Sequence, residues 1–148
     1  MKSIIKIAMI TSCLFLSTIS IAATPTEVFG GCLVDNLNGK ERKKLAKWIF
    51  FAIAAHPEIQ SFSNVSADDR IENDKYIGNL VSRLLADNCP NEMMAAYKVN
   101  PLAIEKAFEL VGQVAMQELM TDQAVTSSIS SYINYTNQEK INNILSVE

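Results

Sequence analysis

Residues 39–55 read GKERKKLAKWIFFAIAA, and this stretch decides the fold class. Its apolar side chains recur at three- and four-residue spacing, so one face of a helix carries Leu45, Trp48, Ile49, Ala52 and Ile53. The same spacing continues along the chain, and no segment alternates strictly between apolar and polar residues over six or more positions. The sequence therefore predicts an all-α fold.

Capping residues and helix breakers divide the rest of the chain into further helices. Thr24 with Glu27, Ser66 with Asp69 and Thr136 with Glu139 have the spacing of a capping box. Together with the breaks at His56-Pro57, Cys89-Pro90 and Asn100-Pro101, they predict a single bundle of about five to six helices. The expected helices cover residues 40–55, 67–88, 101–133 and 137–145, with short ones over 24–37 and 91–98 and with a break or a bend near Thr121-Asp122.

The N-terminus has the pattern of a cleaved secretion signal. Lys2 and Lys6 precede an apolar stretch, and Ser20 and Ala22 supply the small side chains that a signal peptidase needs. We expect cleavage after Ala22, which gives a signal peptide over residues 1–22 and one helical domain over residues 23–148. The domain then lies in the periplasm, without a stable transmembrane anchor.

Two alternatives for this segment stay open. Residues 4–23 are nearly long enough to remain as an uncleaved anchor, although their serine and threonine content favours removal. Cys13 follows a sequence that loosely resembles a lipoprotein processing box, so it is also a candidate lipidation site.

Composition and charge exclude several classes of protein. The chain has 148 residues, of which 49% are hydrophobic and 20% charged, and this excludes a disordered tail. Removal of Lys2 and Lys6 lowers the 13 basic residues to 11, against 16 acidic residues, so the exported chain has a net charge near −5. An acidic chain of this kind is not expected to bind nucleic acid.

Cys32 and Cys89 are expected to form a disulfide, because an exported protein meets an oxidising compartment. Two buried free thiols are the alternative, whereas a redox-active pair would be closer in sequence. If the helices over 40–55 and 67–88 pack as antiparallel neighbours, the two cysteines flank adjacent ends of these helices. The bond would then clamp the open end of a helical hairpin.

Five basic residues open the helix at 40–55, where the helix dipole disfavours positive charge. This pattern indicates an anionic partner, such as an acidic protein or another component of the cell envelope, and a solvated helix start is the alternative. The candidate partner-binding residues are Lys40, Arg42, Lys43, Lys44, Lys47 and Trp48.

Residues 48–55 are apolar on every side of the helix, so this segment is either central in the core or exposed to a partner. The aromatic and methionine content also suggests an alternative function, in which the interior of the bundle carries a small apolar ligand. The side chains that suggest such a carrier are Phe50, Phe51, Met116 and Met120.

The sequence favours a binding protein over an enzyme. It has no nucleophile elbow, phosphate-binding glycine loop or zinc spacing, so we expect no catalytic residue, metal or cofactor. A hydrolase built on His56 with Asp35 or Glu58 is a weaker hypothesis. The carboxylate pairs Glu105/Glu109 and Glu118/Asp122 are expected to face water.

Several segments together resemble a group of small exported all-helical proteins of proteobacteria that have no assigned activity. These segments are CLVD at 32–35, GKERKKLAKWIF at 39–50, AAHPE at 54–58, NCP at 88–90 and AMQELM at 115–120. The resemblance implies a periplasmic location and a joint role for the two cysteines. It implies no catalytic residue and no ligand.

Overall fold

The structure is a computed structural model that describes residues 22–146, and these residues form helices and no strands. The all-α prediction is therefore confirmed. The first part contains α1 (Pro25–Asp35), α2 (Gly39–Ile53), the short α3 (Pro57–Gln60) and α4 (Ala67–Ser82), which continues as a π-helical segment η1 (Arg83–Asn88). Then follow α5 (Pro90–Val99), α6 (Ala103–Leu119), α7 (Gln123–Ser130), a 3-10 segment η2 (Ser131–Tyr135) and α8 (Gln138–Leu145).

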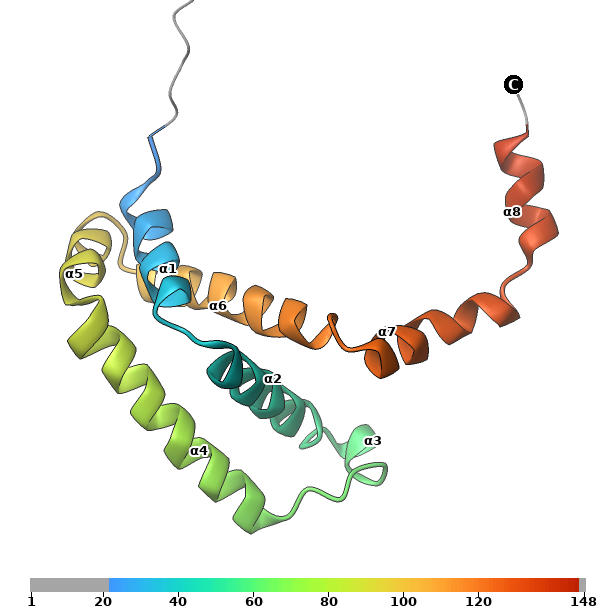
Figure 1. Ribbon diagram of the computed structural model, residues 1–148, viewed down its shortest axis with the longest axis horizontal. Coiled ribbons are helices and arrows are strands. Elements are labelled where there is room, and N and C mark those ends of the chain that lie inside the picture. The colour runs from blue at the N-terminus through green and yellow to red at the C-terminus, as the bar shows by residue number, and fades with distance from the viewer. Residues whose placement is uncertain (1–21, 147–148) are drawn as a thin grey trace, which may run out of the picture.

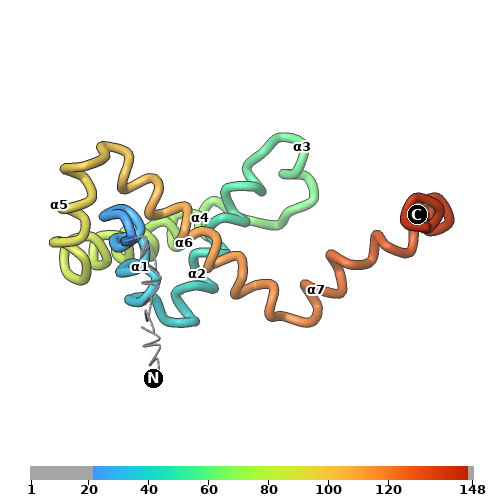
Figure 2. Tube along the Cα trace, turned by 90° about the horizontal axis from the view of Figure 1, so that it is seen from above, coloured from blue at the N-terminus to red at the C-terminus, as the bar shows by residue number. Residues whose placement is uncertain are grey.

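The body of the molecule is made by α1, α2, α4, α5 and α6. α1 packs against α5 and α6, and α2 packs against both α4 and α6 (Figure 1). The interior is apolar apart from Asn73, which is 4% exposed, and its largest fully buried side chains are Phe29, Leu33, Leu84, Cys89 and Val111. α7 and α8 extend away from this body, as Figure 1 and Figure 2 both show.

Local capping bonds fix where the helices of the body begin. The capping boxes predicted at Thr24 and Ser66 are present, and a third one, in which Asn38 caps α2 and Glu41 bonds back, was not predicted. Each box satisfies N–H groups that have no partner within their helix. Asn38 and Glu41 therefore cap the start of α2, and its basic residues take no part in this cap.

The capping box predicted at Thr136 is wrong. The Thr136 hydroxyl donates to the carbonyl of Ile133 at 2.8 Å, which closes η2 instead of opening α8. Asn137 caps α8, and its side-chain oxygen accepts from the Lys140 N–H at 2.9 Å.

The predictions of export and of a membrane anchor depend on the first residues of the chain. The predicted signal peptide over residues 1–22, including Cys13, lies outside the described residues except for Ala22. Within residues 22–146, no helix has the length and the apolar character needed to cross a membrane.

Candidate functional site

The predicted disulfide joins α1 to the start of α5. Cys32 and Cys89 are 57 positions apart in sequence, and their Cα atoms are 6.1 Å apart. Cys32 lies in α1, and Cys89 lies between η1 and Pro90, with no exposed surface. The bond therefore ties the N-terminal helix to the far end of the α4–η1 helix, as the hairpin prediction required.

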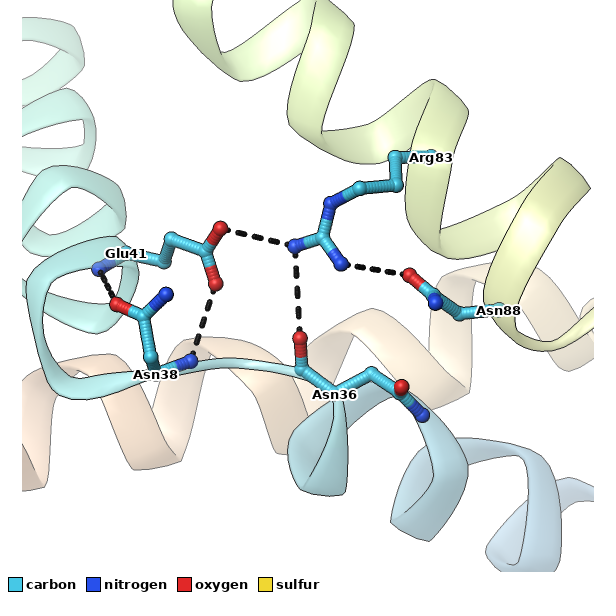
Figure 3. A network of polar contacts seen from close by, with 5 residues as sticks. All are labelled: Asn36, Asn38, Glu41, Arg83 and Asn88. Atoms are coloured by element: carbon cyan, nitrogen blue, oxygen red, sulfur yellow. Dashed lines mark hydrogen bonds and ion pairs between the residues drawn. The ribbon is translucent and has the colours of Figure 1, made fainter.

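A polar network reinforces the same end of the hairpin (Figure 3). The Arg83 guanidinium donates to Glu41 Oε1 at 2.9 Å, to the Asn88 side chain at 2.7 Å and to the Asn36 carbonyl at 3.4 Å. The other carboxylate oxygen of Glu41 accepts from the Asn38 N–H at 3.0 Å, within the capping box of α2. A single glutamate thus caps α2 and also pairs with the end of the neighbouring helix.

Two more contacts hold α2 against α4, one near the middle of the hairpin and one at its other end. The Trp48 indole N–H donates to Asp74 Oδ1 at 2.9 Å, and Arg70, near the start of α4, donates to the Phe51 carbonyl near the end of α2. Since the start of α2 meets the end of α4 and the end of α2 meets the start of α4, the two helices are antiparallel.

Four of the five predicted basic residues lie together on the outer side of α2, at positions 40, 43, 44 and 47. We call Lys40, Lys43, Lys44 and Lys47 the basic ridge. Lys40, Lys43 and Lys47 are exposed, and Lys44 is half-buried. The spacing places all four on one helix face, because residues three and four apart are neighbours on the helix surface.

The side chains of the ridge make only weak contacts. The Lys43 ammonium lies 3.8 Å from Glu118 Oε1, yet the Lys43 side chain is 66% exposed. The Lys44 ammonium lies 5.4 Å from the centre of the Tyr76 ring, and that of Lys47 lies 4.8 Å from the centre of the Phe51 ring. Such exposed contacts contribute little free energy, so the ridge remains free to meet a partner.

Arg42 does not belong to the ridge. Its guanidinium donates to the Val34 carbonyl at 3.4 Å, and its Nε is buried and has no hydrogen-bond partner in the described structure. Arg42 is therefore directed toward the end of α1, and its role as a partner-binding residue has less support than that of the lysines.

The apolar segment of α2 is divided between core and surface. Phe51 and Ala54 are buried, while Trp48, Phe50 and Ile53 are 39–49% exposed. Among the side chains that suggested an apolar ligand inside the bundle, Phe50, Met116 and Met120 lie at the surface. These side chains therefore do not line a shared interior cavity.

A hollow that the sequence did not predict lies on one side of the body. It has a volume of about 700 Å³ and lies between the start of α1, the end of α5 and one side of α6. Pro25, Val99 and Leu110 provide apolar lining, and Lys106 and Glu109 are also in its wall. It forms because α1 packs beside α5 and α6, which lie far from α1 in sequence, so no local sequence pattern predicts it.

The structure does not bring His56 and Asp35 together, as the hydrolase hypothesis requires. These residues flank opposite ends of α2, whose 15 residues span about 22 Å. His56 instead caps α3, because its Nδ1 accepts from the Glu58 N–H at 3.3 Å. Glu58 thus meets His56 through its backbone rather than through its carboxylate.

The acidic residues show no metal site in the described part of the chain. Within residues 22–146, no three histidine, cysteine, aspartate or glutamate side chains gather closely enough to hold a metal ion. Glu105 and Glu109 are exposed, as predicted, whereas Glu118 is half-buried and faces Lys43.

Comparison with protein-family models, with curated proteins and with solved structures finds no match to this chain. The resemblance to small exported helical proteins stays a prediction.

Proposed function

We propose that this protein is an exported, periplasmic helical module that binds an acidic macromolecule through the basic ridge and is not an enzyme. The signal-like pattern at residues 1–22 supports export, and a disulfide suits an oxidising compartment. A protein with acidic side chains on its surface is the partner that fits the ridge best.

The observation that carries this proposal is the placement of four lysines on one exposed face. Like charges three and four residues apart on a helix repel each other by a few tenths of a kcal/mol for each pair. The positive end of the helix dipole adds to this repulsion. An acidic partner would offset this repulsion. Binding should therefore be more favourable in free energy for the ridge than for lysines scattered over the surface.

Glu41 does not neutralise the ridge. Its carboxylate accepts from Arg83 and from the Asn38 N–H, so its charge is directed toward α4 and the loop before α2. Arg42 is directed toward α1. The outer face of α2 therefore presents lysines, and electrostatic attraction should speed association with an acidic surface at low salt.

Fluorescence anisotropy with labelled poly-L-glutamate tests this proposal. We expect binding that weakens with salt, and we expect the Lys40→Glu/Lys47→Glu variant to bind at least about tenfold more weakly. These two positions are chosen because both side chains are exposed and take part in none of the ion pairs of the described residues, whereas Lys43 pairs with Glu118 and Lys44 is half-buried. Exposed side chains at 40 and 47 should leave the circular dichroism spectrum unchanged.

The matched control is Lys75→Glu/Lys98→Glu, which makes the same charge change at exposed positions of α4 and α5. We expect this variant to lose no more than about threefold in affinity, through net charge alone. An equal loss of affinity in the two variants would contradict a specific role for the ridge. The absence of binding by the wild type would contradict it as well. Vesicles containing phosphatidylglycerol test the competing lipid partner in the same assay.

A further inference from the structure

The last two helices form an arm that the body does not cover. We call residues 121–145, which contain α7, η2 and α8, the C-terminal arm. None of these described residues is buried, and the arm extends away from α6 (Figures 1 and 2). α7 and α8 have eight residues each, and isolated helices of this length are marginal in water.

Each segment of the arm carries exposed apolar side chains, which together we call the apolar stripe. Val125 and Ile129 are four residues apart on one face of α7, and Tyr132 and Ile133 follow in η2. Ile141, Ile144 and Leu145 continue with the same kind of spacing in α8. Apart from the half-buried Val125, these side chains are 44–76% exposed, so the stripe is an uncovered surface.

The composition of the arm indicates a protein partner rather than a lipid surface. Residues 123–138 contain no charged side chain, and serine, threonine, asparagine and tyrosine surround the stripe. Charged residues are depleted at the centre of protein interfaces, and tyrosine is enriched there. Helices that lie on anionic membranes carry basic residues on their polar face, and this segment has none.

The exposed apolar surface has the area that a stable dimer needs. The six exposed side chains of the stripe, exposed by 44–76%, provide about 630 Å², at about 180 Å² for a fully exposed side chain. Two copies would then bury about 1,260 Å², and specific interfaces bury about 1,200–2,000 Å² in total. Because the stripe is uncharged and apolar, it is complementary to itself.

We propose that the C-terminal arm is a dimerisation element that packs against the same arm of a second copy of this chain. The contact is isologous: each apolar stripe meets the identical stripe across a twofold axis. The partner arm supplies the packing that the short helices lack within their own chain.

The junction between α6 and the arm supports pairing outside the body. Asp122 caps α7, and its Oδ1 accepts from the N–H groups of Ala124 and Val125 at 2.9 and 3.2 Å. The Thr126 hydroxyl donates to the Met120 carbonyl at 3.0 Å, which links α7 to the end of α6. These bonds order the junction between α6 and α7.

Sedimentation velocity over a concentration series tests the dimer. We expect the wild type to form dimers, and we expect Ile129→Lys/Ile133→Lys to be monomeric or to dimerise at least about tenfold more weakly, because each dimer would bury four unpaired charges. The matched control is Gln123→Lys/Ser127→Lys, which adds the same charges on the opposite side of α7 and should still dimerise.

Folding can be checked separately, since the arm contributes no buried residue and its variants should retain the helical content and thermal unfolding of the body. A wild type that stays monomeric at every concentration overturns the proposal, and so does a stripe variant that dimerises like the wild type. The ridge variant Lys40→Glu/Lys47→Glu should dimerise normally, so failure of the dimer and failure of the acidic-partner proposal are distinguishable.

Discussion

Gly30 shows how one residue sets the distance between two helices. It is buried in α1 against α6, and a Cβ at this position would lie 3.2 Å from Leu110 Cδ2 and 3.7 Å from the Ala107 Cα. The missing side chain lets the two backbones approach closely. Gly31, the next residue, has nothing within 4 Å of its Cβ position, so only one of the two glycines is needed for packing.

This difference makes Gly30→Leu and Gly31→Leu a matched pair. We expect Gly30→Leu to lower the free energy of unfolding by about 1–3 kcal/mol, because the larger side chain forces α1 away from α6. Gly31→Leu should be neutral or stabilising by up to about 1 kcal/mol, since leucine is the better helix former. Urea unfolding measures both values, and equal destabilisation by the two substitutions would disprove the packing role of Gly30.

At the scale of the element, capping bonds make α4 sensitive to acid. The Ser66 hydroxyl and then the Ser66 backbone N–H donate to the Asp69 carboxylate, and these bonds lower the pKa of Asp69 below 3.8. A lowered pKa in the folded state means that the cap stabilises the protein above the unfolded pKa. This stabilisation is lost as the pH falls through the folded pKa.

We therefore expect Asp69→Asn to remove part of the pH dependence of stability in the acid range. The wild type should become less stable relative to this variant as the pH falls below about 4, because only the wild type loses a charged cap there. Urea midpoints measured at several pH values for both proteins check this. Asp68→Asn is the control at the adjacent exposed residue, and it should retain the acid loss due to Asp69.

At the scale of the whole molecule, the disulfide closes a large loop that contains α2, α3 and α4. Replacing Cys32 and Cys89 by alanine should lower the free energy of unfolding by about 4 kcal/mol, because a 57-residue closure restricts the unfolded chain. Urea unfolding of the variant, and of the wild type with and without reductant, measures this loss. The two approaches should agree, and an unchanged midpoint after complete reduction would contradict a stabilising role.

The basic ridge and the C-terminal arm lie on different elements. The proposed contact with an acidic partner and the proposed dimer contact can therefore form at the same time. α2 is held between α4 and α6, so the lysines of the ridge are presented on a rigid support. The arm lies beyond the break at Thr121-Asp122 and is free to pair outside the body. A dimer formed by the arms would present two ridges, and two linked binding sites would bind a large acidic partner with greater avidity.

The sequence by itself determined the all-α class, most helix boundaries and the Cys32–Cys89 pairing. These features depend on local information: apolar spacing, capping residues, and two cysteines in the predicted mature chain that left one pairing. The sequence also predicted that the disulfide clamps the open end of the helical hairpin, because antiparallel neighbours place the start of one helix beside the end of the other.

Only the tertiary structure decided where the side chains of α2 point and which apolar faces are covered. Arg42 and Lys43 are adjacent in sequence, yet Arg42 is directed toward α1 and Lys43 toward α6. The pairing of Glu41 with Arg83 spans 42 positions, and no local pattern predicts it. The stripe of the C-terminal arm has the same helical spacing as a core face, but its burial depends on whether another helix lies against it.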